Sequence, residues 1–437
     1  MAKQKMTLEE KLEEAIVKDI PYEVPDNWIN VKLNSVVKFE KGKKPKILID
    51  YFEDKAIPYV TIKYFQTKEA DQYTFETETN RVCNEDDILI VWDGARAGLI
   101  GTGVQGALGS TLCNIKFNYM NKKFMYYYFI SKYDLINSNT KGTGIPHVDP
   151  TYLNTLVLGI PPLKEQQRIV DKIESLFKKL DKAKELIEEA REEFEKRKSA
   201  ILEKAFRGEL TNSWRCKNYI GNKWGKEKLK NIGKITSGGT PSRKNPKYFE
   251  GDIPWIKTGE IIWNKIYDSE EHITQDAIEN SSAKLIPEGA VLVAMYGQGL
   301  TRGRAAILGN KACTNQAVCS LIPNDEILNY YLYYYFMSNY WRFRQLAKGG
   351  NQENLSGKVI GEFEIEIPLI EEQKEIVRIL DKFLEKESKI EELTVLEEQI
   401  ELIKKSILAK AFRGQLGTNC KEDESALELL KEILKDK

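Results

Sequence analysis

A pattern typical of a long helix with a regularly spaced apolar seam occurs twice in this chain, and it constrains much of the architecture. In the first copy apolar or small residues recur at alternating steps of four and three, with Arg197 taking one position. This alternation averages about 3.5 residues, the period of a coiled-coil seam rather than of an ordinary surface helix. The seam residues are Ile169, Ile173, Leu176, Leu180, Ala183, Ile187, Ala190, Phe194 and Ile201.

The second copy repeats the pattern later in the chain. Its apolar seam residues are Ile376, Leu380, Phe383, Ile390, Leu393, Leu396, Ile400, Ile403 and Ile407, and Glu387 takes one seam position. The step from Ile390 to Leu393 falls where one residue is missing relative to the first copy, which predicts local overwinding. Two such helices in one chain most simply pack on each other. An antiparallel pair would place the globular parts at opposite ends of a rod, because a helix of about 44 residues is roughly 66 Å long.

Similar sequences mark both ends of the two helices. The segments before the helices are Ile160–Gln166 and Ile367–Gln373. Each begins with Ile-Pro and ends with a Glu-Gln pair. Both copies finish in Ala-Phe-Arg-Gly, at Ala205–Gly208 and Ala411–Gly414, where the glycine suits a helix C-cap. We therefore predict a central spacer helix over residues 162–207 and a distal spacer helix over residues 368–413.

The globular sequence before each helix is also duplicated. Trp28 and Leu33 match Trp224 and Leu229, 196 residues later (224 − 28). Short apolar runs between turns predict strands, and Ile57-Pro58-Tyr59-Val60 matches Ile253-Pro254-Trp255-Ile256. An aromatic helix, Met125–Ser131, matches Leu332–Ser338 after insertions that fall chiefly between Pro254 and Val291. We predict one globular domain over residues 24–161 and a second over residues 224–367, so that a unit of one domain and one helix is used twice.

The remaining segments are short. Residues 1–23 contain a helical stretch capped by Thr7 with Glu10 three residues on, 208–223 form a polar connector, and 414–437 form an acidic tail. We expect the two chain ends to lie close together, with the tail bound either to residues 7–18 or to a partner. The predicted fold class is α+β, with two α/β domains joined by two long helices in an antiparallel coiled coil of pseudo-twofold symmetry.

Bulk composition limits the function classes. The 66 basic and 66 acidic residues leave no net charge, so any binding to nucleic acid must use local patches. The six cysteines include no CxxC pair, which favours reduced thiols in a cytoplasmic protein. No signal peptide opens the sequence and no apolar run approaches the ~18 residues of a membrane span, so we expect a soluble protein that binds no membrane.

Several motifs together resemble one known family. Ser237-Gly238-Gly239-Thr240-Pro241-Ser242-Arg243, followed by Gly251–Ile256, resembles a target recognition domain of a type I restriction-modification specificity subunit. The helix endings Ala205–Leu210 and Ala411–Leu416 are similar to the spacer helices of that family. The resemblance covers nearly the whole chain and includes the duplicated order. The first domain departs from it, because Lys41-Gly42-Lys43-Lys44-Pro45-Lys46 replaces the Gly-Gly-Thr-Pro run.

The resemblance implies a subunit without catalysis of its own. Each recognition domain would read one half of a split, asymmetric double-stranded DNA sequence, and the helices would fix the gap. Two methyltransferase subunits would dock on the chain, and restriction subunits would join them for cleavage. The resemblance implies no cofactor in this chain, with S-adenosylmethionine bound to the methyltransferase partner. Half-sites one helical turn apart would lie about 34–36 Å from each other.

Candidate DNA contacts are polar and basic side chains on glycine-containing loops, where backbone can approach a duplex. Arginine suits guanine and glutamine suits adenine. In the first domain they are Lys41, Lys43, Lys44, Lys46, Lys63, Arg96, Lys141 and Thr143. In the second domain they are Ser237, Thr240, Ser242, Arg243, Lys244, Lys257, Thr258, Gln298, Arg302, Arg304, Lys348, Asn351 and Gln352. The alternative is that these residues form ordinary solvated turns.

The tyrosine-rich helices could be base-stacking platforms, but both copies keep the same pattern, which favours a role in the core. A dinucleotide-binding glycine pattern occurs at Gly101-Thr102-Gly103-Val104-Gln105-Gly106. We reject it as a cofactor site, because no helix is predicted after it and no acidic residue occurs about twenty positions later. Only two histidines, His147 and His272, are present, which argues against a metal centre or a nucleophilic triad. The alternative functions are a complete DNA methyltransferase, which would need motifs that the chain lacks, and a coiled-coil scaffold outside restriction-modification.

Overall fold

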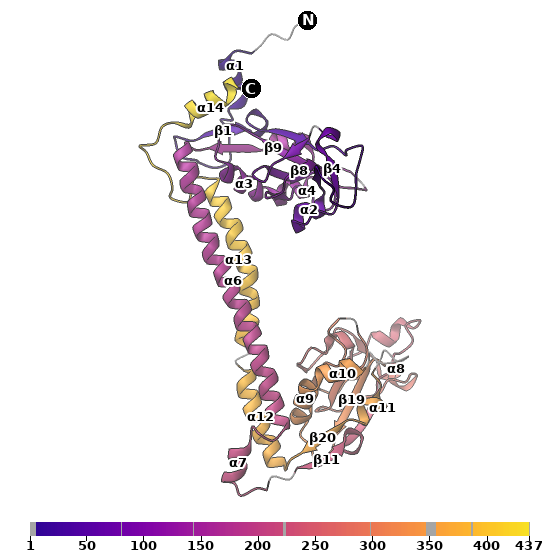
Figure 1. Cartoon of the computed structure of the whole chain (residues 1–437). Helices are drawn as coiled ribbons and strands as arrows, with labels where there is room; N and C mark the ends of the chain where they lie inside the picture. Colours follow the sequence, from indigo (N-terminus) through magenta and orange to yellow (C-terminus); the bar gives the residue numbers. More distant parts are fainter. Residues whose placement is uncertain are drawn as a thin grey trace. The chain divides into compact units, whose positions relative to one another are not determined.

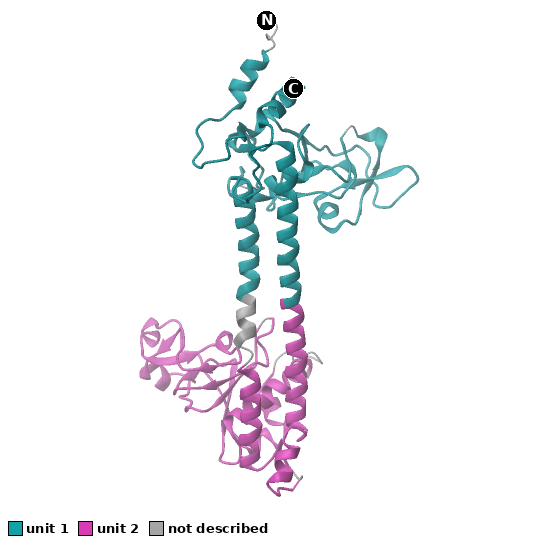
Figure 2. Ribbon diagram, turned by 90° about the vertical axis from the view of Figure 1, so that its left-hand side faces the viewer, with its two compact units in different colours: residues 1–186, 395–437 teal, residues 187–394 magenta. Residues whose placement is uncertain are grey.

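The computed structural model describes residues 6–79, 81–142, 144–221, 224–297, 299–346, 355–385 and 388–436 (Figure 1). At residue 346 and residues 388–394 it describes the backbone but not the side chains. The chain divides into two compact units. Unit 1 comprises residues 1–186 and 395–437, and unit 2 comprises residues 187–394 (Figure 2). Each unit therefore contains one globular domain together with parts of the long helices.

The domain of unit 1 is built on two four-stranded sheets. The main sheet has the order β2 (Lys38–Lys41), β9 (Leu112–Lys116), β6 (Ile88–Val91) and β7 (Ile100–Gly101), all antiparallel. The second has the order β4 (Tyr73–Phe75), β3 (Ala56–Val60), β8 (Gly106–Leu108) and β5 (Val82–Cys83), with β3 and β8 parallel. A separate antiparallel pair joins β1 (Ile29–Lys32) to β10 (Val157–Ile160). The helices are α2 (Ile62–Thr67), α3 (Lys122–Ser131), α4 (Tyr133–Ser138) and α5 (Pro150–Thr155).

The domain of unit 2 repeats this topology. Its main sheet has the order β12 (Gly233–Ser237), β19 (Val318–Pro323), β16 (Val291–Ala294), β17 (Ala305–Leu308) and β14 (Lys265–Ile266). Its second sheet has the order β15 (His272–Ile273), β13 (Ile253–Ile256) and β18 (Cys313–Thr314), with β13 and β18 parallel. β11 (Gly225–Lys228) pairs with β20 (Glu364–Ile367). The helices are α8 (Gln275–Glu279), α9 (Asn329–Ser338), α10 (Tyr340–Leu346) and α11 (Gly357–Gly361).

The strand orders confirm the predicted duplication. The offset is 196 residues at β1 and β11 (225 − 29) and 207 at β10 and β20 (364 − 157). β14 has no equivalent in the first domain and lies within the predicted insertion between Pro254 and Val291. Insertions at such a sheet edge are tolerated because they leave the shared strands in register.

The central strands β6 and β16 are buried on both faces, which explains their unbroken apolar sequences. Ile88 and Ile90 pack into the core that holds α3, whereas Leu89 and Val91 pack between the two sheets. In unit 2, Val291 and Val293 face α9 while the two residues that alternate with them face the second sheet. A strand covered on both faces needs apolar residues at every position rather than at alternate ones.

The tyrosine-rich helices belong to the core, as predicted. Tyr128 on α3 and Tyr335 on α9 are buried, and burial raises the pKa of both phenols. Tyr128 donates a hydrogen bond to the Val157 carbonyl at 3.0 Å, and Tyr335 donates one to the Glu364 carbonyl at 2.9 Å. Each hydroxyl thus ties its helix to the last strand of its domain, which leaves neither ring free to stack on a base.

The first long helix is α6 (Leu163–Phe206), close to the predicted range of 162–207. Within the predicted distal helix over 368–413 the structure describes α12 (Ile370–Leu384) and α13 (Ser388–Ala411), and residues 386 and 387 between them lie outside the described part of the chain. The helices run antiparallel within each unit. In unit 1, Lys404 pairs with Asp181 at 2.7 Å while Arg168, nearer the start of α6, bonds to the Thr418 carbonyl at 2.9 Å.

In unit 2 the same direction holds. The rings of Phe194 and Phe383 are stacked with their centroids 5.3 Å apart, and Thr211, further along the chain, bonds to Glu372, which comes before Phe383. Most of the seam residues are turned away from solvent. Ile169, Ile173, Phe194, Ile376, Leu380 and Ile400 are buried, and Leu176, Leu180, Ile187, Ile201, Phe383 and Ile407 are half-buried. Leu396 and Ile403 depart from the pattern with 42% and 45% exposure, and the side chains of Ile390 and Leu393 lie outside the described residues.

A buried carboxylate anchors the start of each long helical stretch. Glu165 accepts a hydrogen bond from the Trp28 indole at 2.9 Å and one from Thr418 at 3.3 Å. Glu372 accepts the equivalent bonds from Trp224 at 3.2 Å and from Thr211 at 2.5 Å. The neighbouring glutamines, Gln166 and Gln373, both donate to a proline carbonyl at 3.0 Å. The repeated Glu-Gln pair of the sequence is therefore a structural joint between helix, domain and connector.

The chain ends meet in unit 1, which confirms another prediction. α1 (Leu8–Ala15) begins at a capping box made by Thr7 and Glu10, and it packs against α14 (Ala426–Lys435). Lys11 donates a hydrogen bond to the Leu434 carbonyl at 2.9 Å. The acidic tail thus binds residues 7–18 of its own chain. A short helix, α7 (Asn212–Lys217), lies in the connector of unit 2. Among the described residues, no helix is long and apolar enough to span a bilayer.

All six cysteines are free, and their burial predicts their reactivity. Burial raises the pKa of Cys83 and Cys313 to about 11 and that of Cys113 and Cys319 to about 12. The thiolate is the reactive form, so these four thiols should resist a disulfide reagent at about pH 8 in the folded chain. Exposed Cys216 should react first and half-buried Cys420 more slowly. Rapid titration of four or more thiols before denaturant is added would contradict this burial.

Candidate nucleic-acid interface

Three loops predicted separately to bind DNA come together in unit 1. Lys41 ends β2, Asp93 follows β6, and the third loop carries Lys141 and His147. Lys41 Nζ lies 3.0 Å from Asp93 Oδ2, and His147 Nδ1 lies 2.6 Å from Asp93 Oδ1. Backbone bridges join His147 to both Asp93 and Lys141. We call Lys41, Asp93 and His147 the Asp93 cluster.

The Asp93 cluster combines the donors and the acceptor that base edges require. Lys41 is 46% exposed and His147 is 47% exposed, so both can reach a ligand while Asp93 orients them. A carboxylate accepts from the cytosine amino group, and lysine donates to guanine or phosphate. The same three stretches of sequence carry further exposed cations. They are Lys43, Lys44, Lys46, Arg96 and Lys141.

Of the remaining first-domain candidates, Lys63 lies on another element. Lys63 sits on α2 and pairs with Asp71 at 2.9 Å, and this partner raises the lysine pKa. No described contact joins Lys63 to the Asp93 cluster. Thr143 falls outside the described residues. Lys141 pairs with Asp149 at 2.9 Å, and that lysine holds the pKa of the Asp149 carboxyl below its usual value.

The glycine run of the second domain has a packing role. A Cβ atom on Gly238 would lie 2.1 Å from the Thr314 carbonyl oxygen, and one on Gly239 would lie 2.3 Å from the Ser282 carbonyl carbon. Only glycine fits such close backbone contacts. The Trp255 indole donates to the Gly239 carbonyl at 2.9 Å. The run therefore fixes Thr240 beyond it, which bonds to Gln316.

Arg243 and Lys257 meet at one carboxylate. Arg243 Nη2 lies 2.6 Å and Lys257 Nζ lies 3.0 Å from the Glu271 oxygens. Burial tends to raise the pKa of Glu271, but its bonds to Lys257 and Arg243 outweigh that effect and lower it. The Arg243 guanidinium also stacks 4.1 Å above the Phe249 ring centroid. Near them on the sequence, Ser242 and Lys244 are exposed, and Ser237 and Thr258 are half-buried.

A loop between β16 and β17 carries Arg302 and Arg304, both half-buried. Arg344 on α10 holds this loop, donating to the Gly299 carbonyl at 2.7 Å and to the Arg302 carbonyl at 3.1 Å. Tyr340, one turn earlier on α10, donates to the Leu300 carbonyl. Gln298, Lys348, Asn351 and Gln352 lie outside the described residues.

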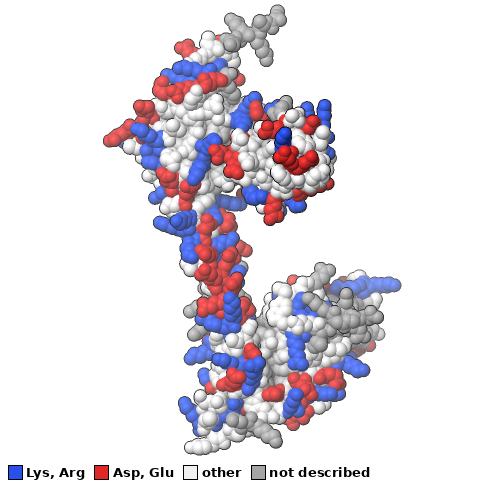
Figure 3. Space-filling view, viewed as in Figure 1, with Lys and Arg blue, Asp and Glu red and all other residues white. Residues whose placement is uncertain are grey.

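Sequence reasoning missed the residues that position these loops. His147 was considered only as a metal ligand, and Arg344 and Tyr340 were not considered. No local pattern marks them, since each acts on a loop more than 35 residues away in the chain. Among the residues that the structure describes, no group of three or more His, Cys, Asp or Glu side chains could hold a metal ion. On the face in Figure 3, basic and acidic side chains are interspersed.

Comparison with known proteins finds relatives of this architecture. The family model described as "Type I restriction modification DNA specificity domain" matches residues 25–192 and again 221–402. The MjaVIII type I restriction enzyme specificity subunit of Methanocaldococcus jannaschii is 29% identical over 414 residues, which cover 90% of this chain and 94% of that protein.

Two solved structures share the fold. A chain from a structure of type I R-M complex assembly is 21% identical with a TM-score of 0.71, covering 91% of this chain and all of that one. The HsdS subunit from Thermoanaerobacter tengcongensis is 20% identical with a TM-score of 0.55, covering 92% of this chain and all of that one. Their likeness agrees with the predicted α+β class and its two recognition domains.

Proposed function

The chain belongs to the type I restriction-modification DNA specificity family, and from that premise we propose that its two domains each read one half of a bipartite, asymmetric DNA site. The observation that carries the proposal is the Asp93 cluster. Three loops from distant parts of one domain converge there with exposed cations around a carboxylate. In unit 2 the loops after β12 and β16 carry different side chains, among them Thr240 and Arg302. Two similar readers with unlike loops suit two different half-sites.

We further propose that the long helices set the gap between the half-sites. α6 contains 44 residues, which corresponds to roughly 66 Å at about 1.5 Å per residue. That length exceeds the ~34–36 Å between half-sites one helical turn apart. The antiparallel contacts within each unit support a stiff pair, because stacked rings and ion pairs join the two helices.

The same helices offer apolar surface for methyltransferase subunits. Within unit 1 the side chains of Leu186, Val395, Leu396 and Leu402 are 52%, 53%, 42% and 65% exposed. Exposed apolar side chains that gather on one surface are typical of a protein contact. We propose that two methyltransferase subunits bind there and carry the S-adenosylmethionine, that restriction subunits join them, and that this chain contributes no catalysis. Free cysteines favour action in the reducing cytoplasm.

Replacing Arg302 with alanine tests the reading role. If Arg302 contacts a base of the second half-site, discrimination at that base pair should fall by about 1–3 kcal/mol, roughly tenfold to over a hundredfold. Methylome sequencing of cells that carry the complex would show relaxed sequence at one half-site and an unchanged other half. Arg96→Ala in unit 1 is the matched control and should affect the opposite half. Uniform loss over all sequences would show that Arg302 contacts phosphate only.

A further inference from the structure

Unit 1 contains an extended segment that has no counterpart among the described residues of unit 2. Residues 16–24 follow α1, and Val17 donates a backbone hydrogen bond to the Asn30 carbonyl of β1 at 2.8 Å. A backbone bridge between Ile16 and Val31 extends this pairing. The segment therefore lies along the edge of β1 that faces away from β10, where it shields an otherwise open strand edge.

The same segment fills a site beside that strand with an aromatic ring. The Tyr22 ring lies 5.2 Å from the Arg413 guanidinium, at the end of α13. Besides burial, the nearby phenols of Tyr22 and Tyr152 raise the pKa of Tyr128, which places these rings around one site. Pro25 then passes against Gly414, where an added Cβ would meet the proline ring at 2.3 Å.

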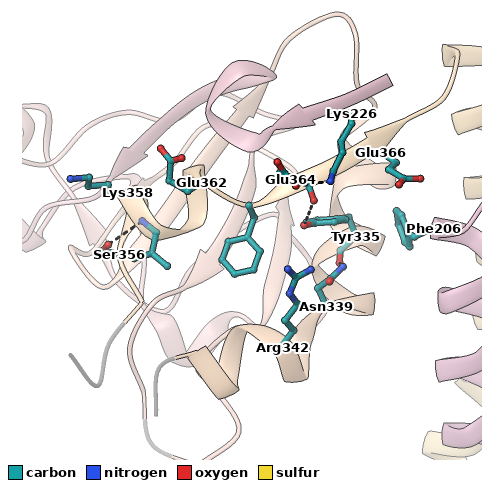
Figure 4. Close-up of a pocket in the computed structure, with 12 residues that line it drawn as sticks. Phe206, Lys226, Tyr335, Asn339, Arg342, Ser356, Lys358, Glu362, Glu364 and Glu366 are labelled. Carbon is teal, nitrogen blue, oxygen red and sulfur yellow. Dashed lines mark hydrogen bonds and ion pairs between the residues drawn. The ribbon is translucent and has the colours of Figure 1, made fainter. Parts of the chain in front are cut away.

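In unit 2 the equivalent position is a cavity of about 920 Å³ (Figure 4). The internal repeat relates its wall residues to those around Tyr22. Phe206 corresponds to Phe412, Tyr335 to Tyr128, and Val359 to Tyr152. Within the described residues β11 pairs with β20 alone, so its outer edge has no counterpart of residues 16–24.

The cavity wall suits an aromatic side chain with a carboxylate beside it. Phe206, Tyr335 and Phe363 supply ring surfaces. Lys226 is already paired with Glu364 at 2.7 Å. Arg342 lies 5.4 Å from the Phe363 ring centroid, and among the described residues neither Arg342 nor Lys358 forms an ion pair. Figure 4 shows Arg342 and Asn339 reaching from the helices toward Tyr335 and Glu364. Together with Lys226, Arg342 helps to lower the pKa of the Glu364 carboxyl, so the charge of Arg342 is partly offset, whereas exposed Lys358 has no ion pair among the described residues. Ring surfaces beside the Lys358 ammonium favour a segment like Tyr22-Glu23.

We propose that this cavity and the outer edge of β11 form a docking site for an extended segment of a partner protein. The segment adds a strand to β11, places an aromatic side chain in the cavity and directs a carboxylate to Arg342 or Lys358. Main-chain pairing supplies affinity and the cavity supplies sequence selectivity in this mode of recognition. The site goes beyond DNA reading and does not depend on it. It also distinguishes unit 2 from unit 1, where the chain occupies the equivalent site itself.

A labelled peptide copying residues 14–26, titrated into the full chain, tests the site. We expect the peptide to bind the parent chain saturably. Its affinity should fall at least about tenfold when the chain carries Val359→Glu or Arg342→Glu, or when the peptide carries Tyr22→Ala. The peptide variant requires no change in the folded protein. Gln345→Glu, on the same helix as Arg342 but not in the cavity wall, is the matched control and should bind as the parent does.

The contrary results are equally definite. Absence of saturable binding would overturn the proposal, as would equal binding by the Val359→Glu and parent chains. Sedimentation of the full chain alone addresses a second occupant, since self-association that is lost on deleting residues 1–24 would assign the cavity to another copy of this chain. The Arg302→Ala chain should lose DNA selectivity but bind the peptide as the parent does. Failure of the docking proposal can therefore be distinguished from failure of the DNA-reading proposal.

Discussion

Replacing Glu372 with alanine is expected to destabilise unit 2 by about 3–5 kcal/mol, the cost of leaving a buried charge without its partner. Glu372 is 1% exposed, and its carboxylate is paired with Arg215, whose side chain is 7% exposed. Arg215 also donates to Thr211 at 3.1 Å. Without the carboxylate, the guanidinium, the Trp224 indole and the Thr211 hydroxyl all lose an acceptor within the protein interior.

Trp224 offers the measurement, because its indole donates to Glu372 and should report the loss directly. Denaturant unfolding followed by tryptophan fluorescence, together with hydrogen exchange of peptides from unit 2, would locate the effect. Glu371→Ala is the matched control, since the neighbouring side chain is exposed. Glu165→Ala in unit 1 should cost less, about 1–3 kcal/mol, because Glu165 accepts from Trp28, Thr418 and Asn419 but pairs with no buried arginine. Equal losses for Glu371→Ala and Glu372→Ala would refute the anchoring role.

Repetition made the fold predictable from the sequence. A heptad seam sustained over a helix of 44 residues leaves few alternatives, and the apolar run Ile88–Val91 recurs at Val291–Ala294 because both strands are covered on two faces. The same pattern could not reveal that the seam residues Leu396 and Ile403 are 42% and 45% exposed. The period of a seam indicates which residues of one helix could face a partner helix. Whether each of them is buried depends on how close the partner helix lies at that position.

The candidate interface was predictable only loop by loop. Lys41 and Lys141 stand out locally as exposed basic residues, but their meeting through Asp93 and His147 depends on strand pairing between distant segments. The Gly238-Gly239 pair was interpreted as a loop that approaches DNA, and the structure instead gives these glycines close contacts with Thr314 and Ser282. A glycine pair in a sequence indicates close backbone approach, but it does not indicate what is approached.

Lengthening the helical pair by one heptad should move recognition to a different gap. Seven residues inserted after Glu185 in α6, with a matching heptad after Leu396 in α13, preserve the seam because a heptad is two turns of a coiled coil. The insertion adds about 10.5 Å of rise, or about three base pairs at ~3.4 Å each. If the helices set the gap, the original site loses one half of its contacts, and its methylation should fall by more than about a hundredfold.

A plasmid library with randomised gap lengths, methylated in cells by the complete complex and then sequenced, measures the outcome. The favoured gap should lengthen by about three base pairs. Methylation at the new gap should be weaker than methylation by the parent chain at its own gap. With 10–10.5 base pairs in each helical turn, three added base pairs also rotate one half-site by about 100° relative to the other. A chain with the heptad in α6 alone is the control, since it mispairs the seam and should lose activity at every gap. Undiminished methylation of the original site by the double insertion would show that something other than the paired helices fixes the distance.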